Sequence, residues 1–183
     1  MNDLEKIRAL TDADVPLGLV YDRSFDDFKA QQPTWVSARQ LKSSKGILIS
    51  DGFSRCQGVS FLDKRLEVGA IAHNHPRDDP YYTLTGKWSE YEKRFEDPKK
   101  IFEDMNKVVA VHVYHEGRYS WPERCIEKAL KRTGIERVVH IPIKSKESGR
   151  VFWRCMAQDV KKGEVYIFPT DFNYGLCYKL NQK

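Results

Sequence analysis

Short apolar runs separated by polar or glycine-containing stretches make up most of the chain. Runs of this length, rich in Val, Ile, Phe and Tyr, are typical of β-strands rather than of helices. The pattern predicts strands at 16–22, 34–41, 46–51, 58–63, 68–73, 108–117, 137–143, 149–158 and 164–169. Because only the polar stretch DKRLE separates 58–63 from 68–73, we expect these two strands to pair as a hairpin.

Two segments carry apolar residues at helical spacing instead. Residues 3–11 form a short amphipathic pattern, and 123–133 place Ile126, Ala129 and Leu130 on one stripe. No internal repeat, low-complexity tract or linker interrupts the chain. The expected fold class is therefore α+β, in a single domain that is rich in antiparallel strands.

Composition narrows the classes of partner and location. The 183 residues are 40% apolar and 31% charged, with a formal net charge of +5. No run of about eighteen apolar residues occurs, so we expect no membrane span. The N-terminus lacks the apolar core of a secretory signal, and we expect a cytoplasmic protein. The densest basic pairs, Lys99-Lys100 and Lys161-Lys162, sit among acidic residues, so nucleic acid is not an expected partner.

The four cysteines, Cys56, Cys125, Cys155 and Cys177, include no CxxC pair, and in a reducing compartment they are free thiols. Cys56 is distinguished by its position, because it comes just before the predicted hairpin and His73 ends that hairpin. A histidine within reach of a thiol can take its proton and return it to a leaving amine.

A hydroxyl and a turn also lie close to Cys56 in the sequence. Ser50, at the end of the preceding strand, is placed to orient the imidazole, and the loop containing Gly52 can direct backbone N–H groups at an oxyanion. The residues therefore indicate a thiol catalytic site.

This region resembles the chemotaxis receptor deamidase family CheD. Members of that family have a threonine six residues before the cysteine and a histidine seventeen residues after it, where this chain has Ser50 and His73. Further matches are Val59, Asp63, Gly69 and Ala72. Residues 46–76 match well, and 108–169 match loosely through a helix, the Gly149-Arg150-Val151 segment and the KKGEVYIF hairpin.

The resemblance implies a strand-rich mixed β-sandwich flanked by helices, which CheD shares with the catalytic domain of cytotoxic necrotizing factor toxins. It implies a cysteine-dependent deamidase that converts glutamine to glutamate, releases ammonia and uses neither metal nor cofactor. Cys56 is then the nucleophile and His73 the acid and base. Ser50 keeps the hydroxyl of the family threonine and orients the imidazole.

The partner implied is a protein substrate that carries a glutamine side chain, alongside which a regulatory protein can act. Residues 1–45 and 77–107 lie outside the match. Within a single domain of 1–183, we interpret them as an N-terminal extension packed on the domain and as an insertion. The insertion is polar and rich in aromatic residues and proline, which suits a lid or a partner-binding segment.

Two alternatives stay open from the sequence. The segment AHNHP is similar to the metal-binding segment of JAB-type (JAMM) zinc metalloproteases, in which two histidines such as His73 and His75 bind zinc. That family also needs an aspartate ligand at the position that Gly86 occupies here. The second alternative is a non-catalytic binding protein that keeps the fold and simply buries Cys56.

Overall fold

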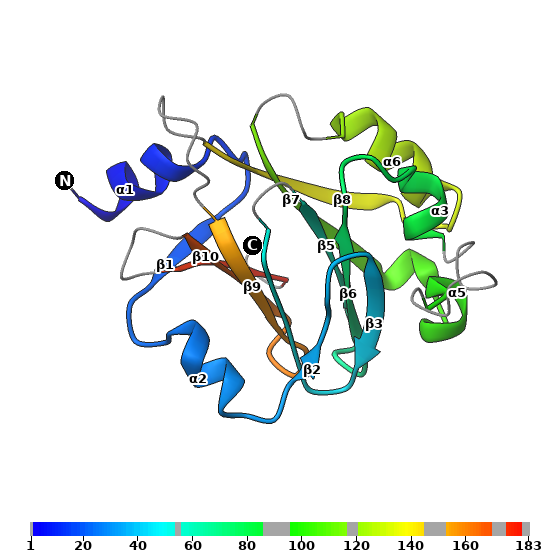
Figure 1. The fold of residues 1–183 in the computed structure, drawn as a ribbon, viewed down its shortest axis with the longest axis horizontal. Helices are drawn as coiled ribbons and strands as arrows, with labels where there is room; N and C mark the ends of the chain where they lie inside the picture. The colour runs from blue at the N-terminus through cyan, green and yellow to red at the C-terminus, as the bar shows by residue number, and fades with distance from the viewer. Residues whose placement is uncertain are drawn as a thin grey trace.

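Two mixed β-sheets packed face to face form the framework of the protein, and most of the described helices lie on their outer sides (Figure 1). This computed structural model describes residues 2–53, 56–85, 96–116, 121–144, 153–169 and 175–180. The fold is α+β and strand-rich in a single domain, as the sequence predicts.

The helices are α1 (Asp3–Leu10), α2 (Phe25–Lys29), α3 (Pro80–Leu84), α5 (Pro98–Ile101) and α6 (Glu123–Lys131), with a short 3-10 helix at Met105–Lys107. The strands are β1 (Leu17–Val20), β2 (Thr34–Trp35), β3 (Gln40–Ser44), β4 (Ile47–Asp51), β5 (Gln57–Asp63), β6 (Gly69–Asn74), β7 (Val108–His115), β8 (Arg137–Ile143), β9 (Trp153–Asp159), β10 (Glu164–Pro169) and β11 (Gly175–Lys179).

The two sheets differ in strand order, but each contains one parallel pair among antiparallel pairs. The first runs β1-β11-β10-β9-β4-β2 and is antiparallel except for the pair β2 and β4. The second runs β3-β6-β5-β7-β8 and is antiparallel except for β7 and β8. Because β4 and β6 belong to different sheets, side chains at their ends can meet only across the space between the sheets.

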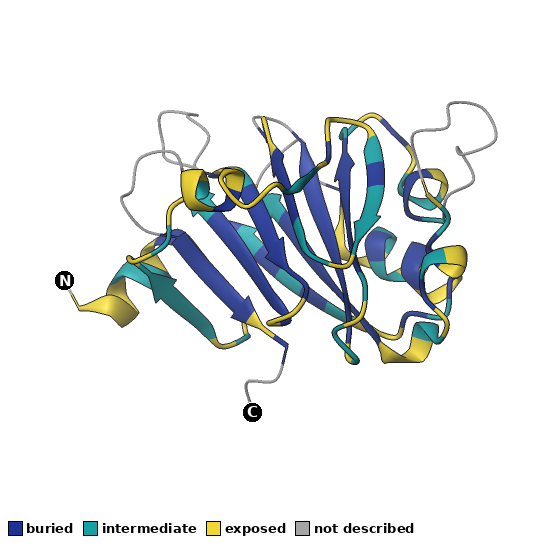
Figure 2. Ribbon diagram, turned by 90° about the horizontal axis from the view of Figure 1, so that it is seen from below, coloured by how far each residue is buried: buried dark blue, intermediate teal, exposed yellow. Residues whose placement is uncertain are grey.

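The main apolar core fills that space. Alternation along the strands sends one set of side chains inward, such as Leu62 of β5 and Ile71 of β6, and the other set outward, such as Phe61. The outward set of the second sheet packs under α6 and the segments of α3 and α5, so both faces of that sheet are buried (Figure 2). Helix α2 covers part of the outer face of the first sheet.

The predicted hairpin is confirmed as β5 and β6, all of whose residues are buried. Gly58 lies opposite His73 in this pair. A Cβ atom at Gly58 would lie 2.6 Å from the Met156 sulfur and 3.2 Å from the Trp153 ring, so the two sheets approach closely here only because that position is glycine.

The prediction of one extended segment at 34–41 is wrong. The chain leaves β2 at Trp35, turns, and enters β3 of the other sheet at Gln40. Arg39 adopts a left-handed conformation with φ of 59°, and the Gln40 side chain accepts a hydrogen bond from the Ser37 N–H. These local features end one strand and start the next, and the apolar pattern carries no sign of them.

The remaining segments hold the edges of the sheets. Residues 2–45 contribute α1, β1, α2, β2 and β3, and α1 packs on β1. Of the predicted insertion at 77–107, residues 86–95 lie outside the described part, as does the Gly149-Arg150-Val151 segment. Within the described residues, no helix has the length and apolar character needed to cross a membrane.

Candidate active site

Ser50 and His73 meet between the two sheets. Ser50 lies near the end of β4 and His73 near the end of β6, and both side chains are fully buried. The Ser50 Oγ atom is 2.9 Å from His73 Nδ1. The structure therefore brings together the two residues that the sequence pairs as hydroxyl and imidazole.

The hydrogen bonds assign the tautomer of His73. The Ser50 hydroxyl donates its single proton to the Val36 carbonyl oxygen, 2.5 Å away. Its oxygen is consequently the acceptor for His73, so the proton on the ring is at Nδ1. Nε2 then carries the lone pair, and within the described residues this buried atom has no hydrogen-bond partner. Leaving such a group unsatisfied is unfavourable to folding by about 1–3 kcal/mol, and unpartnered buried groups are rare.

Cys56 lies at the same end of the hairpin and on the same side of the sheet. It directly precedes β5, two residues before Gly58, the partner of His73 in the register. It belongs to the core cluster between the sheets, with 8% of its surface exposed. Residues in this diagonal relation have Cβ atoms separated by about 7–8 Å or somewhat less. The thiol and the His73 ring therefore lie on the same side of the second sheet, at the same end of the hairpin.

The pKa values of both groups favour their neutral forms. Burial, with a smaller contribution from Asp78, raises the pKa of the Cys56 thiol, and the Arg39 guanidinium opposes that rise. Burial lowers the pKa of His73 to about 4, with a smaller contribution from His75. The resting site therefore holds a thiol and a neutral imidazole rather than an ion pair.

An ion pair that the sequence did not indicate lies beside Cys56. The Arg39 Nε atom is 2.9 Å from Asp78 Oδ2, and a second contact joins the guanidinium to the other carboxylate oxygen. The Arg39 backbone N–H also donates to the His73 carbonyl oxygen at 2.8 Å. No spacing in the sequence links positions 39 and 78, because they meet only through the packing of β3 against β6.

An aromatic stack also escaped the sequence analysis. The Phe53 ring stacks on His73 on one side and on Trp153 on the other, each with centroids 4.0 Å apart. Phe53 is fixed further by its backbone, whose carbonyl oxygen is 2.9 Å from His115 Nε2. The stack restricts rotation of the imidazole and keeps water away from one face of the ring.

The predicted oxyanion loop is only partly described. Gly52 has a φ of 77°, a conformation that suits glycine, and it begins the turn between β4 and Cys56. The Phe53 N–H is already donated to the Arg154 carbonyl oxygen. Ser54 and Arg55, the two residues next to Cys56, lie outside the described residues.

The geometry at the two histidines does not resemble a complete metal site. The His73 Nδ1 atom faces Ser50, and His75 Nδ1 accepts from the Arg77 N–H at 3.2 Å. Across the described ranges, no group of three or more His, Cys, Asp or Glu side chains is arranged to hold a metal ion.

A second polar network lies on the opposite face of the β5–β6–β7 sheet. His112 of β7 is fully buried there, with Nε2 2.7 Å from Gln57 Oε1 and Nδ1 3.0 Å from His140 Nδ1. The other nitrogen of His140 is 3.4 Å from Glu127 on α6. Gln57 is the residue that follows Cys56, so this network supports the chain next to the thiol from the other side.

Comparison with family models and with curated proteins finds no match to this chain. The resemblance to CheD therefore stays a prediction that depends on the residues around Cys56 and His73.

Proposed function

We propose that this chain is a cysteine-dependent amidohydrolase that deamidates glutamine side chains of a protein substrate. One arrangement carries the proposal: His73 is held at Nδ1 by Ser50, and its open Nε2 lies on the same side of the hairpin as Cys56. An imidazole of this tautomer, next to a thiol, has the geometry of a general base for a nucleophilic cysteine.

The reaction balances with these groups and one water molecule. The Cys56 sulfur attacks the carboxamide carbon while its proton passes to His73 Nε2, which gives a tetrahedral oxyanion. His73 then returns the proton to the nitrogen, the C–N bond breaks and ammonia leaves a thioester on Cys56. His73 next takes a proton from water as the water oxygen attacks the thioester. Cleavage of the C–S bond with return of that proton gives glutamate and the free thiol.

The pKa values set the order of proton transfer in this scheme. Burial raises the pKa of Cys56 and lowers that of His73, so a stable thiolate–imidazolium pair is not expected at neutral pH. Transfer then accompanies attack on the carboxamide, as it does in hydroxyl-based hydrolases. Ser50 stabilises the imidazolium that forms transiently, because its oxygen accepts from Nδ1–H.

The burial of the Cys56 thiol favours attack on a side-chain carboxamide over attack on a main-chain amide. Cys56 exposes only 8% of its surface, so a bulky peptide segment cannot lie across it without rearrangement. A glutamine carboxamide sits at the end of a slender side chain and needs a narrower opening than a peptide segment to reach the thiol. The four cysteines are all free, which suits a reducing compartment, and we infer a cytoplasmic location.

The test is conversion of glutamine to glutamate in blocked glutaminyl peptides, followed by mass spectrometry and ammonia release. Cys56→Ala is expected to abolish conversion, since no other thiol can replace the nucleophile. Cys177→Ala, at another buried cysteine, is the matched control and should retain it. Full turnover by Cys56→Ala would refute the proposal.

A further inference from the structure

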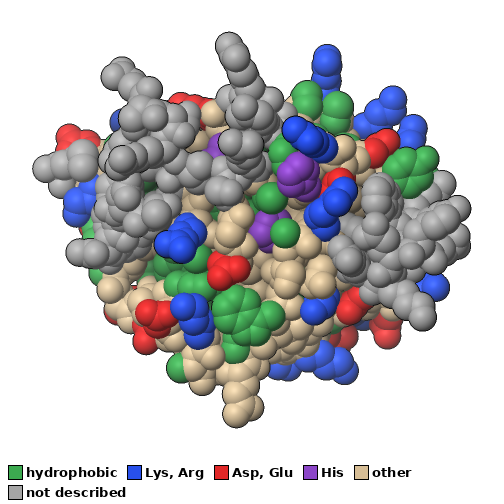
Figure 3. Space-filling view, viewed as in Figure 1, with side chains coloured by type: hydrophobic (Ala, Val, Ile, Leu, Met, Phe, Trp, Pro, Cys, Tyr) green, Lys and Arg blue, Asp and Glu red, His purple; other side chains and the backbone are tan. Residues whose placement is uncertain are grey.

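A groove between α3 and α6 lies on the outer, helix-covered side of the second sheet, and the loop between β6 and α3 connects it to the candidate active site. It encloses about 580 Å³, and its walls include Tyr81 and Tyr82 of α3 and Lys128 and Arg132 of α6. A smaller hollow of about 450 Å³ continues along α6. Figure 3 shows Lys and Arg side chains gathered at the upper right of the molecule, where Figure 1 places α6.

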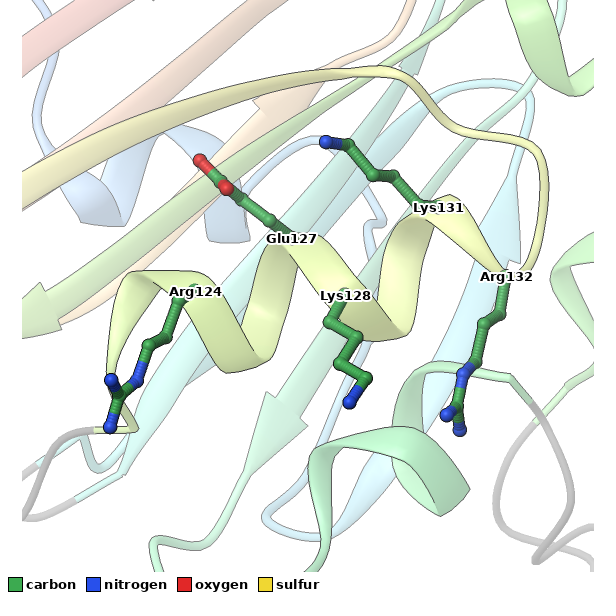
Figure 4. Close-up of a pocket in the computed structure, with 5 residues that line it drawn as sticks. All are labelled: Arg124, Glu127, Lys128, Lys131 and Arg132. Atoms are coloured by element: carbon green, nitrogen blue, oxygen red, sulfur yellow. The ribbon is translucent and has the colours of Figure 1, made fainter.

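The cations of α6 form one edge of this groove. Arg124, Lys128 and Arg132 are spaced by four residues, and all three point toward the α3 side of the helix (Figure 4). All three are exposed, and within the described residues neither Arg124 nor Lys128 forms an ion pair. Like charges four residues apart on a helix repel one another, so the isolated helix gains nothing from this pattern. A bound anion would remove that repulsion.

The acidic residues of the same region are already engaged elsewhere. Glu127 points away from the groove and lies 3.4 Å from His140 Nε2 (Figure 4). Glu123 accepts a hydrogen bond from the Tyr114 hydroxyl. Asp79, which lines the groove, accepts from the Tyr81 N–H as the cap of α3. Among the described residues, none of these three carboxylates forms an ion pair with Arg124, Lys128 or Arg132, and Asp79 contributes a single negative charge to the wall of the groove.

The opposite wall is aromatic. The Arg132 guanidinium lies over the Tyr81 ring at 4.8 Å, and Tyr82 is 42% exposed. Positive charge on one wall and aromatic surface on the other fit a peptide with carboxylates on one side and apolar side chains on the other. A nucleic-acid backbone instead favours a long basic track, which the groove does not provide.

The groove is connected to the candidate active site through a short segment. Asp78, which pairs with Arg39 beside Cys56, is followed directly by Asp79 at the start of α3. The Trp121 indole N–H, just before α6, donates to the Pro76 carbonyl oxygen at 3.2 Å. Both walls are thus anchored to the loop that follows His73.

We infer that the groove between α3 and α6 binds an acidic segment of the substrate protein, and that a glutamine of that same substrate enters the active site. This inference depends on the proposed function, because it names the kind of protein substrate that the enzyme would select. An acidic segment in the groove would raise the local concentration of a nearby glutamine at Cys56.

The test is fluorescence anisotropy with a fluorescein-labelled peptide of alternating Glu and Leu that contains one Gln, using full-length Cys56→Ala protein to prevent turnover. The triple variant Arg124→Glu/Lys128→Glu/Arg132→Glu is expected to bind at least about tenfold more weakly. The matched control is Lys64→Glu/Lys99→Glu/Lys161→Glu, which changes the net charge equally at exposed cations elsewhere. We expect it to bind within about twofold of the parent.

A milder variant keeps the test valid if the triple reversal does not fold. Arg124→Gln/Lys128→Gln should weaken binding by about threefold or more. With Cys56 restored, the groove variant should raise KM for the acidic peptide more than it lowers kcat. Equal weakening by the groove and control variants would overturn the inference, as would equal affinity for the Lys counterpart of the peptide.

The two proposals can fail separately. Groove-dependent binding of the acidic peptide without any conversion of glutamine would refute the deamidase and leave the docking surface in place. Cys56-dependent conversion with unchanged Kd and KM in the groove variants would overturn the docking surface alone. Competition by RNA or anionic lipid vesicles as effective as the unlabelled peptide would also overturn it.

Discussion

His73 on β6 and His112 on β7 are both fully buried histidines of one sheet, on the two strands that flank β5, yet their surroundings differ. His112 faces the helices, and each of its nitrogens has a partner, Gln57 at Nε2 and His140 at Nδ1. His73 faces the other sheet, with Nδ1 held by Ser50 and Nε2 without a partner in the described part of the chain. A satisfied imidazole stabilises a fold, whereas a fixed imidazole with one open nitrogen is ready to take a proton.

The comparison shows that burial alone does not identify a candidate catalytic histidine. Burial lowers the pKa of His73 to about 4 and the pKa of His112 well below its ordinary value. What separates them is the number of engaged nitrogens and the presence of a thiol on the same side of the sheet. Substitutions at the two sites should therefore affect different quantities.

Replacement of the open imidazole should have the largest effect. His73→Gln keeps a buried polar side chain of similar size but has no basic nitrogen, so kcat for deamidation should fall about 10³-fold. His112→Gln is the matched control on the other face, and its kcat should stay within about threefold of the wild-type value. The measurement is ammonia release under saturating peptide. A similar loss of kcat in the two variants would contradict the distinction drawn between His73 and His112.

Removal of the hydroxyl that fixes the tautomer should have an intermediate effect. Ser50→Ala leaves Nδ1 without its acceptor, so kcat should fall roughly tenfold to a hundredfold. Ser50→Thr keeps the hydroxyl and should restore most of the rate. Ser60→Ala removes another buried hydroxyl, one with no hydrogen-bond partner among the described residues, and should leave kcat unchanged. Equal rates for Ser50→Ala and Ser50→Thr would contradict an orienting role.

The dependence of activity on pH should reflect the buried, neutral base. Because the pKa of His73 is lowered to about 4, the acidic limb of kcat/KM should lie near that pH rather than at the ordinary histidine value of about 6.5. Because burial raises the pKa of Cys56, the alkaline limb should lie above its ordinary range. A pH–rate profile of the wild type tests both limbs, and an acidic limb at about pH 6.5 would contradict a buried, neutral base.

Stability should also depend on pH through the same residue. Between about pH 6.5 and pH 4 the unfolded chain binds a proton at His73 that the folded chain does not, so the free energy of unfolding falls as the pH falls. His73 accounts for roughly 3 kcal/mol of this loss, and His112 acts in the same direction. In His73→Gln, the free energy of unfolding, measured with denaturant at several pH values, should depend less steeply on pH than in the wild type. An unchanged pH dependence would contradict this role of His73.

The smallest expected effect on activity is at His112, where stability should respond instead. His112→Gln disrupts the contacts to Gln57 and His140, and the free energy of unfolding should fall by about 1–3 kcal/mol. Thermal unfolding and kcat measured on the same preparation separate the two quantities. Loss of activity without loss of stability would place His112 in the mechanism.

The local parts of the structure could be predicted from the sequence. The β5–β6 hairpin follows from two apolar runs and a short polar turn, and its pairing brings His73 back beside the start of β5. Helix α6 follows from its apolar stripe. The contact between Ser50 and His73 was expected from the family pattern, although the roles of both residues stay predictions.

Features formed by the packing of distant segments could not be predicted in this way. The His73–Phe53–Trp153 stack joins three separate parts of the chain, and the Arg39–Asp78 pair depends on a turn that the apolar pattern does not reveal. The cation spacing on α6 is visible in the sequence, but the aromatic wall opposite it comes from how α3 packs on that helix.

The most direct test of the central claim is intact-mass analysis of the enzyme after rapid acid quenching during turnover of a glutaminyl peptide. The account predicts a thioester adduct on Cys56, equal in mass to the peptide less ammonia, that is strongly reduced in His73→Gln and absent in Cys56→Ala. Steady ammonia release by the wild type with no adduct at Cys56, and the same release by Cys56→Ala, would contradict it.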